Sequence, residues 1–252
     1  MFKKLFAGVA LSAIAAVSYA GSAQAANFTY SSGVFRDANV TNQGSFSENV
    51  NKDGYVTFDF NGSNSLPGND IVKYSFQGSN NKTQVVKSGR EMKWAPAAVV
   101  AEDNKSPYLQ VFQGKSVVIE TAKEGETFNY FGLHLGSLSS GNVLEFFKGS
   151  EAVKFNYKDA KGEDKFATTL TFDLLKTLAP TLGYRNQTNG FFEFFSQGFN
   201  DNFDKIVISQ VGGGGFETDN HTFRIGKGKF SQAASVPEPS IALGMLAVGG
   251  SM

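Results

Sequence analysis

Five oxygen-bearing side chains in the late part of the chain have the chemistry of a hard-cation site. They are Asn200, Asp201, Asp204, Asp219 and Asn220. Ca²⁺ takes six to eight carboxylate, amide and carbonyl oxygens in a flexible geometry, so Ca²⁺ is the cofactor that this set could bind. The spacing does not follow an EF-hand loop, and Asn and Asp also form turns by bonding their own backbone. The preferred interpretation is therefore turn formation, with no bound cofactor.

The chain has two histidines, His134 and His221, and no cysteine. A Ser-His-Asp hydrolase would need one histidine beside an activated serine, and no Gly-x-Ser-x-Gly elbow marks such a serine. The lack of cysteine excludes a cysteine nucleophile, thiolate zinc ligands and disulfide bonds. We therefore expect packed imidazoles and no enzymatic activity.

The alternative is a secreted hydrolase that acts on polysaccharide with two carboxylates about 5 to 9 Å apart across a sandwich cleft. Glu145 and Glu193 lie on different predicted strands and are one such pair. Sugar binding without hydrolysis would instead use aromatic faces, for which the candidates are Trp94, Tyr130, Tyr184 and Phe191. Aromatic residues in strands more often belong to the core or its rim, and this interpretation is preferred for all four.

The elements that must position these residues are short strands. The chain contains 25 Phe and 28 Gly, and apolar residues alternate with polar ones between turn-forming segments. This pattern predicts ten strands, at residues 56–60, 71–76, 116–119, 128–135, 143–147, 153–157, 166–172, 191–195, 205–209 and 222–225. The fold class that follows is all-β, a β-sandwich of jelly-roll type with few short helical turns.

Helical signals are few. Residues 172–180 predict one or two turns, with Asp173 as N-cap and Pro180 as the stop, and residues 91–101 could hold a turn around Trp94. Residues 27–54 are rich in Asn, Ser and Gly and predict an irregular lead-in with one or two edge strands. The turn at residues 61–62 and the glycine run at residues 212–215 are expected to close hairpins.

The N-terminus has the pattern of a secretory signal peptide. Lys3 and Lys4 precede an apolar stretch over residues 5–17, and Ala23 and Ala25 provide the small-x-small pattern of signal peptidase cleavage. We expect cleavage between Ala25 and Ala26. Residues 1–25 are thus the predicted signal peptide, and the protein is predicted to be exported.

The C-terminus has a second pattern, two prolines that flank a glutamate ahead of an apolar run. Proline fixes φ and removes a backbone donor, so the predicted domain, residues 26–232, ends before this motif. The segment Val236, Pro237, Glu238, Pro239 and Ser240 resembles the PEP-CTERM sorting signal of exosortase-dependent surface proteins. Residues 233–252 are then a shortened sorting tail, because only 12 residues follow Ser240 and a spanning helix needs about 20.

The resemblance extends into the domain, through residues 130–147 and through residues 203–209 and 216–221, which are similar to a central hairpin and closing strands of the same group. It implies processing by an exosortase, transient membrane association, and a place in the cell envelope, at the surface or outside the cell. The signals at the two ends, together with the lack of a catalytic constellation, favour a structural or adhesive role, with exopolysaccharide as the expected partner.

Net charge gives no sign of a nucleic-acid partner. The 23 basic and 23 acidic residues balance, and loss of Lys3 and Lys4 with the signal peptide leaves 21 against 23, a charge of −2. Binding to phosphate backbones depends on clustered Lys and Arg, and no basic stripe stands out. Nucleic acid is therefore not an expected partner.

Overall fold

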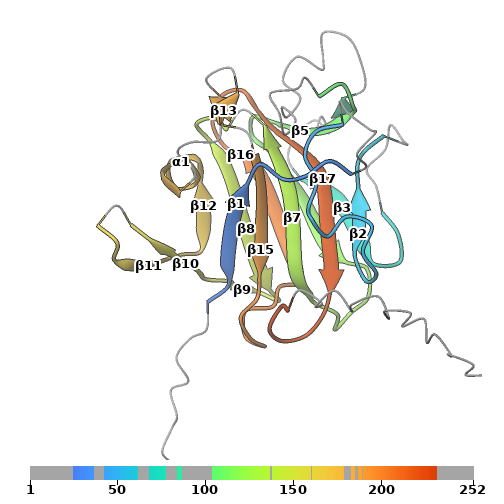
Figure 1. Ribbon diagram of the computed structural model, residues 1–252, viewed down its shortest axis with the longest axis vertical. Helices are drawn as coiled ribbons and strands as arrows, with labels where there is room; N and C mark the ends of the chain where they lie inside the picture. The colour runs from blue at the N-terminus through green and yellow to red at the C-terminus, as the bar shows by residue number, and fades with distance from the viewer. Residues whose placement is uncertain are drawn as a thin grey trace, which may run out of the picture.

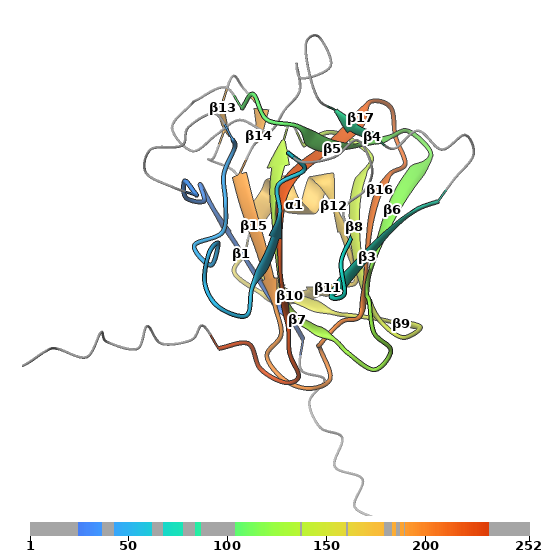
Figure 2. The same cartoon turned by 90° about the vertical axis from the view of Figure 1, so that its right-hand side faces the viewer.

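The computed structural model describes residues 25–36, 43–61, 68–77, 84–86, 104–136, 138–159, 161–178, 183–184, 187–188 and 190–231. Two antiparallel sheets pack face to face around one hydrophobic core (Figure 1). Figure 2 shows them from the side, with β1, β15 and β7 on the left and β8, β16 and β6 on the right. The predicted all-β sandwich is confirmed.

The first sheet has seven strands. In spatial order they are β1 (Asn27–Ser31), β15 (Gly190–Phe195), β7 (Phe128–Gly136), β17 (Gly215–Ile225), β5 (Tyr108–Phe112) and β4 (Gln84–Val86), with β2 (Val56–Phe58) paired to the second half of β17. The central strands β7 and β17 alternate between core-facing residues and residues of the outer face. This sheet carries the buried histidines and most of the buried carboxyl groups described below.

The second sheet has six strands. In order they are β12 (Thr169–Thr171), β8 (Asn142–Lys148), β16 (Lys205–Gln210), β6 (Lys115–Thr121) and β3 (Val72–Gln77), with β9 (Glu151–Ala152) beside β8. Two small hairpins complete the strands, β10 (Phe155–Lys158) with β11 (Asp164–Ala167) and β13 (Gly183–Tyr184) with β14 (Gln187–Thr188). The single described helix is α1 (Phe172–Leu178), where the sequence predicts one.

Consecutive strands mostly change sheets, as from β5 to β6, β6 to β7, β7 to β8 and β16 to β17. All ten predicted runs overlap strands, although the run at 166–172 spans β11 and β12, which belong to different sheets. Three expected hairpins are wrong. Residues 212–215 cross from β16 to the other sheet, β2 and β3 lie in different sheets, and so do β7 and β8. Turn residues mark where the chain reverses, but they do not determine which sheet receives the next strand.

Phenylalanine rings from both sheets fill the core. The ring of Phe146 on β8 lies 4.7 Å from that of Phe194, 4.8 Å from that of Phe155 and 5.0 Å from that of Phe203, between centroids. It also meets Phe131 edge-on at 6.1 Å. Because Phe131 and Phe194 belong to the seven-stranded sheet, this cluster joins the two layers of the sandwich.

Residues 43–55, the last part of the predicted lead-in and called the lead-in segment from here on, cover part of the outer face of the seven-stranded sheet. Phe46, Ser45 and Ser47 on this segment are each 1% exposed. Backbone bonds between Val34 and Phe46 tie the segment to the chain that leaves β1. An outer face that would otherwise meet water is therefore partly buried, and its polar residues must find partners within the protein.

Within the described residues, no helix combines the length and the apolar character that crossing a membrane requires.

Candidate functional site

The most unusual polar arrangement lies at a β-bulge in β17. Asp219 pairs with His134 of β7, whereas Thr222 pairs with Gly132, so two residues of β17 lie opposite one residue of β7. Asn220 takes up the extra length with a φ of 51°. Because a bulge shifts the alternation of side chains, Asp219 faces outward beneath the lead-in segment while His221 faces the core.

Asp219 is a completely buried carboxyl group. Its Oδ2 accepts hydrogen bonds from Asn104 Nδ2 at 2.9 Å and Ser106 Oγ at 3.3 Å, and its Oδ1 accepts one from the backbone N–H of Asn220 at 2.8 Å. Burial raises the pKa of Asp219 well above its usual range, and the nearby Asp59 carboxylate raises it further. The ion pairs formed by the described residues do not include Asp219.

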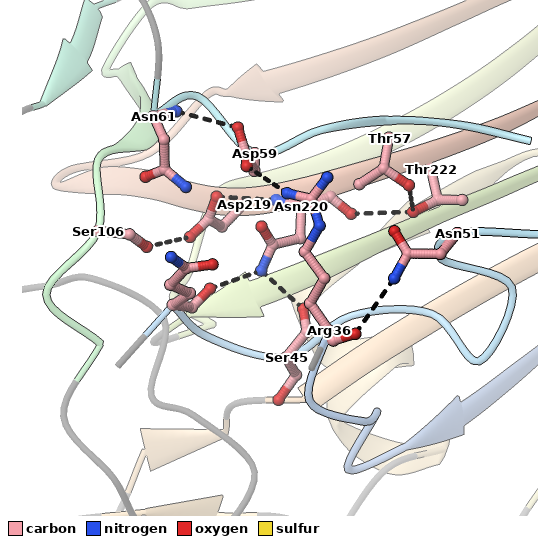
Figure 3. A network of polar contacts seen from close by, with 11 residues as sticks. Arg36, Ser45, Asn51, Thr57, Asp59, Asn61, Ser106, Asp219, Asn220 and Thr222 are labelled. Carbon is pink, nitrogen blue, oxygen red and sulfur yellow. Dashed lines mark hydrogen bonds and ion pairs between the residues drawn. The ribbon is translucent and has the colours of Figure 1, made fainter. Parts of the chain in front are cut away.

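Asp59 lies at the solvent side of the same cluster (Figure 3). Its Oδ2 pairs with Arg36 Nη1 at 2.6 Å, and its Oδ1 accepts the backbone N–H of Asn61 at 3.2 Å. The side chains of Arg36 and Asp59 are 37% and 26% exposed, so water reaches this edge of the cluster.

The side-chain amide of Asn220 has a fixed orientation. Its Nδ2 donates to the carbonyl oxygens of Gln43 at 2.8 Å and Ser45 at 2.9 Å, so this atom must be nitrogen. Its Oδ1 is buried and has no hydrogen-bond partner among the described residues. Figure 3 shows the amide nitrogen turned to the lead-in segment and the oxygen on the side of Asp59 and Asp219.

His134 packs under the lead-in segment. Its Nδ1 accepts the backbone N–H of Ser45 at 2.9 Å, and the ring is 0% exposed. Gly44, with a φ of +75°, passes so close that a Cβ there would lie 2.7 Å from this Nδ1. The imidazole thus anchors the segment over the sheet, which agrees with the packed role expected from the sequence.

His221 lies between the two sheets. Its Nδ1 is 2.9 Å from the hydroxyl of Tyr74 on β3, and its Nε2 is 2.9 Å from Oγ1 of Thr218. Complete burial lowers its pKa to about 3. The ring is therefore neutral at physiological pH and serves as a packed polar link between the layers.

Glu217 is a second buried carboxyl group, two residues before Asp219 on the same face of β17. Its Oε1 accepts a hydrogen bond from Gln110 Nε2 at 2.8 Å, and it is 4% exposed. Burial raises its pKa to about 7. This carboxyl group titrates near neutral pH, well above the ordinary range of glutamate.

The five candidate calcium ligands do not come together. Asp201 accepts backbone N–H groups of Gln197 and Gly198, Asp204 accepts that of Gly149, and Asn200 is exposed. Phe203, beside this loop, pairs with Phe128 at the start of β7, whereas Asp219 pairs with the sixth residue further along that strand. Six residues of strand span roughly 20 Å, so only Asp219 and Asn220 belong to the bulge cluster.

In the part of the chain that the structure describes, no three His, Cys, Asp or Glu side chains form a group that could hold a metal ion. Asp201 accepts backbone N–H groups three and four residues before it, as the turn-forming interpretation expects, whereas Asp204 bonds Gly149 and so links two separate segments.

Two of the four sugar-binding candidates are buried. Tyr130 and Phe191 are each 1% exposed, and the ring of Phe230 stacks on Tyr130 with centroids 5.0 Å apart. The hydroxyl of Tyr130 donates to Glu193 at 2.5 Å. Neither ring offers an open face to a sugar. Trp94 and the side chain of Tyr184 lie outside the described residues.

Glu145 and Glu193 do not face each other. Glu145 alternates with the core residues Leu144 and Phe146, so it points outward from the six-stranded sheet, where Thr169 donates to it at 3.3 Å. Glu193 alternates with core residues of β15 and points outward from the seven-stranded sheet. The two carboxylates lie on opposite faces of the sandwich, separated by both sheets, so this pair cannot act across one cleft.

Four members of the bulge cluster are not predicted from the sequence: Asp59, Asn104, Ser106 and Gly44. They come from three segments far apart in the chain, and no local spacing connects them. The one available signal is the pair of adjacent polar residues Asp219 and Asn220 inside an otherwise strand-like run, since Asn tolerates the left-handed conformation of a bulge.

The residues that carry the sorting hypotheses lie mostly outside the described chain. This holds for Ala23 and for the motif from Val236 to Ser240, whereas Ala25 and Ala26 are described and lie buried just before β1. A scan against protein-family models finds no family that matches this chain, and a search of curated proteins finds no match.

Proposed function

We propose that this chain is an exported, exosortase-dependent protein of the cell surface or extracellular matrix with a structural or adhesive role. The observation that carries the proposal is the segment Val236 to Ser240, with its two prolines around Glu238, together with a signal-peptide pattern at the other end. No enzymatic role is part of this proposal.

The end of the described chain supports it. The backbone N–H of Phe230 donates to the carbonyl of Ser196 at 2.9 Å, and the Phe230 ring stacks on Tyr130. The motif begins at residue 236, six residues later. The sandwich thus packs the chain up to Phe230, and a sorting signal placed shortly after a packed domain can be processed without unfolding that domain.

The start of the domain is compatible with removal of the signal peptide. The backbone nitrogen of Ala26 donates to the carbonyl of Lys154 at 2.8 Å. Cleavage between Ala25 and Ala26 would convert this amide into an ammonium group, which can donate the same hydrogen bond. The mature chain would therefore keep the pairing between Ala26 and the strand that contains Phe155.

Removal of residues 233–252 tests the sorting proposal. We expect the truncated protein to leave the surface fraction and to accumulate in the medium or periplasm, because nothing would direct it to an exosortase. Cell fractionation with immunodetection measures the distribution. A variant with Pro237→Ala and Pro239→Ala keeps the length and apolar run of the tail and should behave like the truncation. An unchanged surface fraction in both variants would contradict the proposal.

The proposed partner is exopolysaccharide, and the proposed interaction is binding without turnover. A glycan array combined with a reducing-sugar assay on the purified protein separates binding from hydrolysis. Retention of a glycan without release of reducing ends is the expected result. Release of product would support the hydrolase alternative.

A further inference from the structure

The bulge in β17 brings two carboxyl groups together, and the described residues provide only one positive charge beside them. Asp219 is 0% exposed and receives only hydrogen bonds from neutral groups. Burying an ionised carboxylate costs several kcal/mol unless a positive charge accompanies it. Asp59 adds a second carboxylate nearby, and Arg36 contributes one positive charge, which it directs at Asp59.

An independent observation indicates a missing partner at the same place. Oδ1 of Asn220 is a buried acceptor without a hydrogen-bond partner among the described residues. Flipping the amide would not help, because the other atom must be the nitrogen that donates to the carbonyls of Gln43 and Ser45. A buried acceptor without a partner costs about 1–3 kcal/mol. A ligand that carries positive charge and binds oxygen would satisfy both this atom and the carboxylates.

We propose that Asp59, Asp219 and Asn220 bind a hard divalent cation, tested here as Ca²⁺, at the solvent-accessible edge of the bulge. Each of the three supplies an oxygen that retains unused lone pairs in its present contacts. Ca²⁺ accepts carboxylate and amide oxygens in irregular geometry and completes its shell with water, which suits a site with few protein ligands.

Arg36 determines how strongly this site binds the ion. Its guanidinium lies 2.6 Å from Asp59 at the entrance and is 37% exposed, so it can turn into solvent. When Asp59 and Asp219 are both ionised, the site has a net charge of −1 with Arg36 present and −2 without it. A cation must therefore compete with Arg36 for Asp59, and removal of the guanidinium should tighten binding.

The competing explanation is a proton. A protonated Asp219 would need no cation, and the raised pKa of this group by burial is compatible with that state. The two explanations make different predictions. If Asp219 is simply protonated, added metal should have no effect and Asp59 should not be needed. Experiments with Ca²⁺ alone as the probe can therefore separate them.

The test is titration of the purified, metal-stripped full chain with CaCl₂ at pH 8, by calorimetry and by thermal unfolding. We expect one saturable site and a melting temperature that rises with Ca²⁺. Asp219→Asn and Asp59→Asn should each weaken binding at least tenfold, and Arg36→Gln should strengthen it. Mg²⁺ should bind more weakly, because it requires near-ideal octahedral geometry.

Asp204→Asn is the matched control. The Asp204 carboxylate also accepts a backbone N–H, that of Gly149, but it lies roughly 20 Å from the proposed site. This variant should leave Ca²⁺ binding unchanged. If Asp219→Asn does not fold, Asp59→Asn decides the outcome, because Asp59 is partly exposed and its loss does not open the core. The absence of a Ca²⁺-dependent shift in the wild-type protein, or equal loss of binding in Asp204→Asn, would overturn the proposal.

Discussion

At the scale of single residues, this protein depends on polar groups that are buried outside its hydrophobic core. His134, Asp219 and Asn220 lie between the seven-stranded sheet and the lead-in segment, and each of them contacts that segment or the loop beside it. Such contacts fix the position of an irregular segment that has few apolar side chains to hold it. Their loss should therefore destabilise the protein locally, even where no large side chain is removed.

Gly44 illustrates the close approach of this segment to the sheet. Gly44→Ala should destabilise the protein by about 2–4 kcal/mol, because the methyl group strains a φ of +75° and also meets His134 and Asn104. Gly54→Ala is the control, since its φ is +80° and nothing lies within 4 Å of a new Cβ. It should cost only about 1 kcal/mol. Urea unfolding measures both, and equal losses would show that the contact with His134 does not matter.

Glu217 gives the protein a stability that depends on pH. Between its ordinary pKa of 4.5 and its folded pKa of about 7, the folded protein retains a proton that the unfolded chain has released. The free energy of unfolding therefore falls as pH rises through this window. Glu217→Gln should be roughly 3 kcal/mol more stable than the wild type at pH 8 and equally stable at pH 4.

Urea unfolding at the two pH values measures this difference. The exposed Glu124 provides the control, because Glu124→Gln should follow the wild-type protein at both pH values. A stability gain for Glu217→Gln that is the same at pH 4 and pH 8 would exclude titration of Glu217 as its cause.

At the scale of elements, alternation of apolar and polar residues predicts the strands well. Val207 and Ile208, for example, alternate correctly between the outer face and the core of β16. Strand pairing is harder to predict from the sequence, because turn residues such as those at 212–215 do not specify which sheet the next strand joins. β5 (Tyr108–Phe112) is not predicted, because Gln110 is its one polar side chain between the core residues Leu109 and Val111, and the sequence shows a nearly continuous apolar run.

The candidate site is predicted only in part for a related reason. Asp219 and Asn220 stand next to each other and are visible as candidates, but Asp59 is 160 positions earlier in the chain. Sheet pairing between β2 and β17 brings these segments together. No spacing rule within one segment can report a contact that depends on which strands are neighbours.

Phe146 on β8 is the ring that links the two layers of the sandwich. Phe146→Ala should cost about 3–5 kcal/mol, because it leaves a cavity among Phe155, Phe194 and Phe203. Phe166 on β11 is 60% exposed, and Phe166→Ala should change stability by less than about 0.5 kcal/mol. Thermal and urea unfolding measure both variants. Similar losses for the two would mean that the layers are not held together by this cluster.

At the scale of the whole molecule, the chain ends and the sandwich have separate tasks in the proposed function. The sandwich is stabilised without disulfide bonds, since the chain has no cysteine. The predicted destination depends on segments before Ala25 and after Ser231, outside the described residues. A sandwich that stays folded while its ends are cut is what passage through signal peptidase and exosortase would require.

The position of β17 has a mechanical consequence. It is the last strand that the structure describes, and it is hydrogen-bonded to β7 along one edge and to β5 and β2 along the other. A chain held by its C-terminal tail would transmit a pulling force along the axis of β17. Ladder bonds run perpendicular to that axis, so they would be loaded in shear and all at once rather than opened one after another. The domain should therefore resist extension strongly when it is tethered at this end.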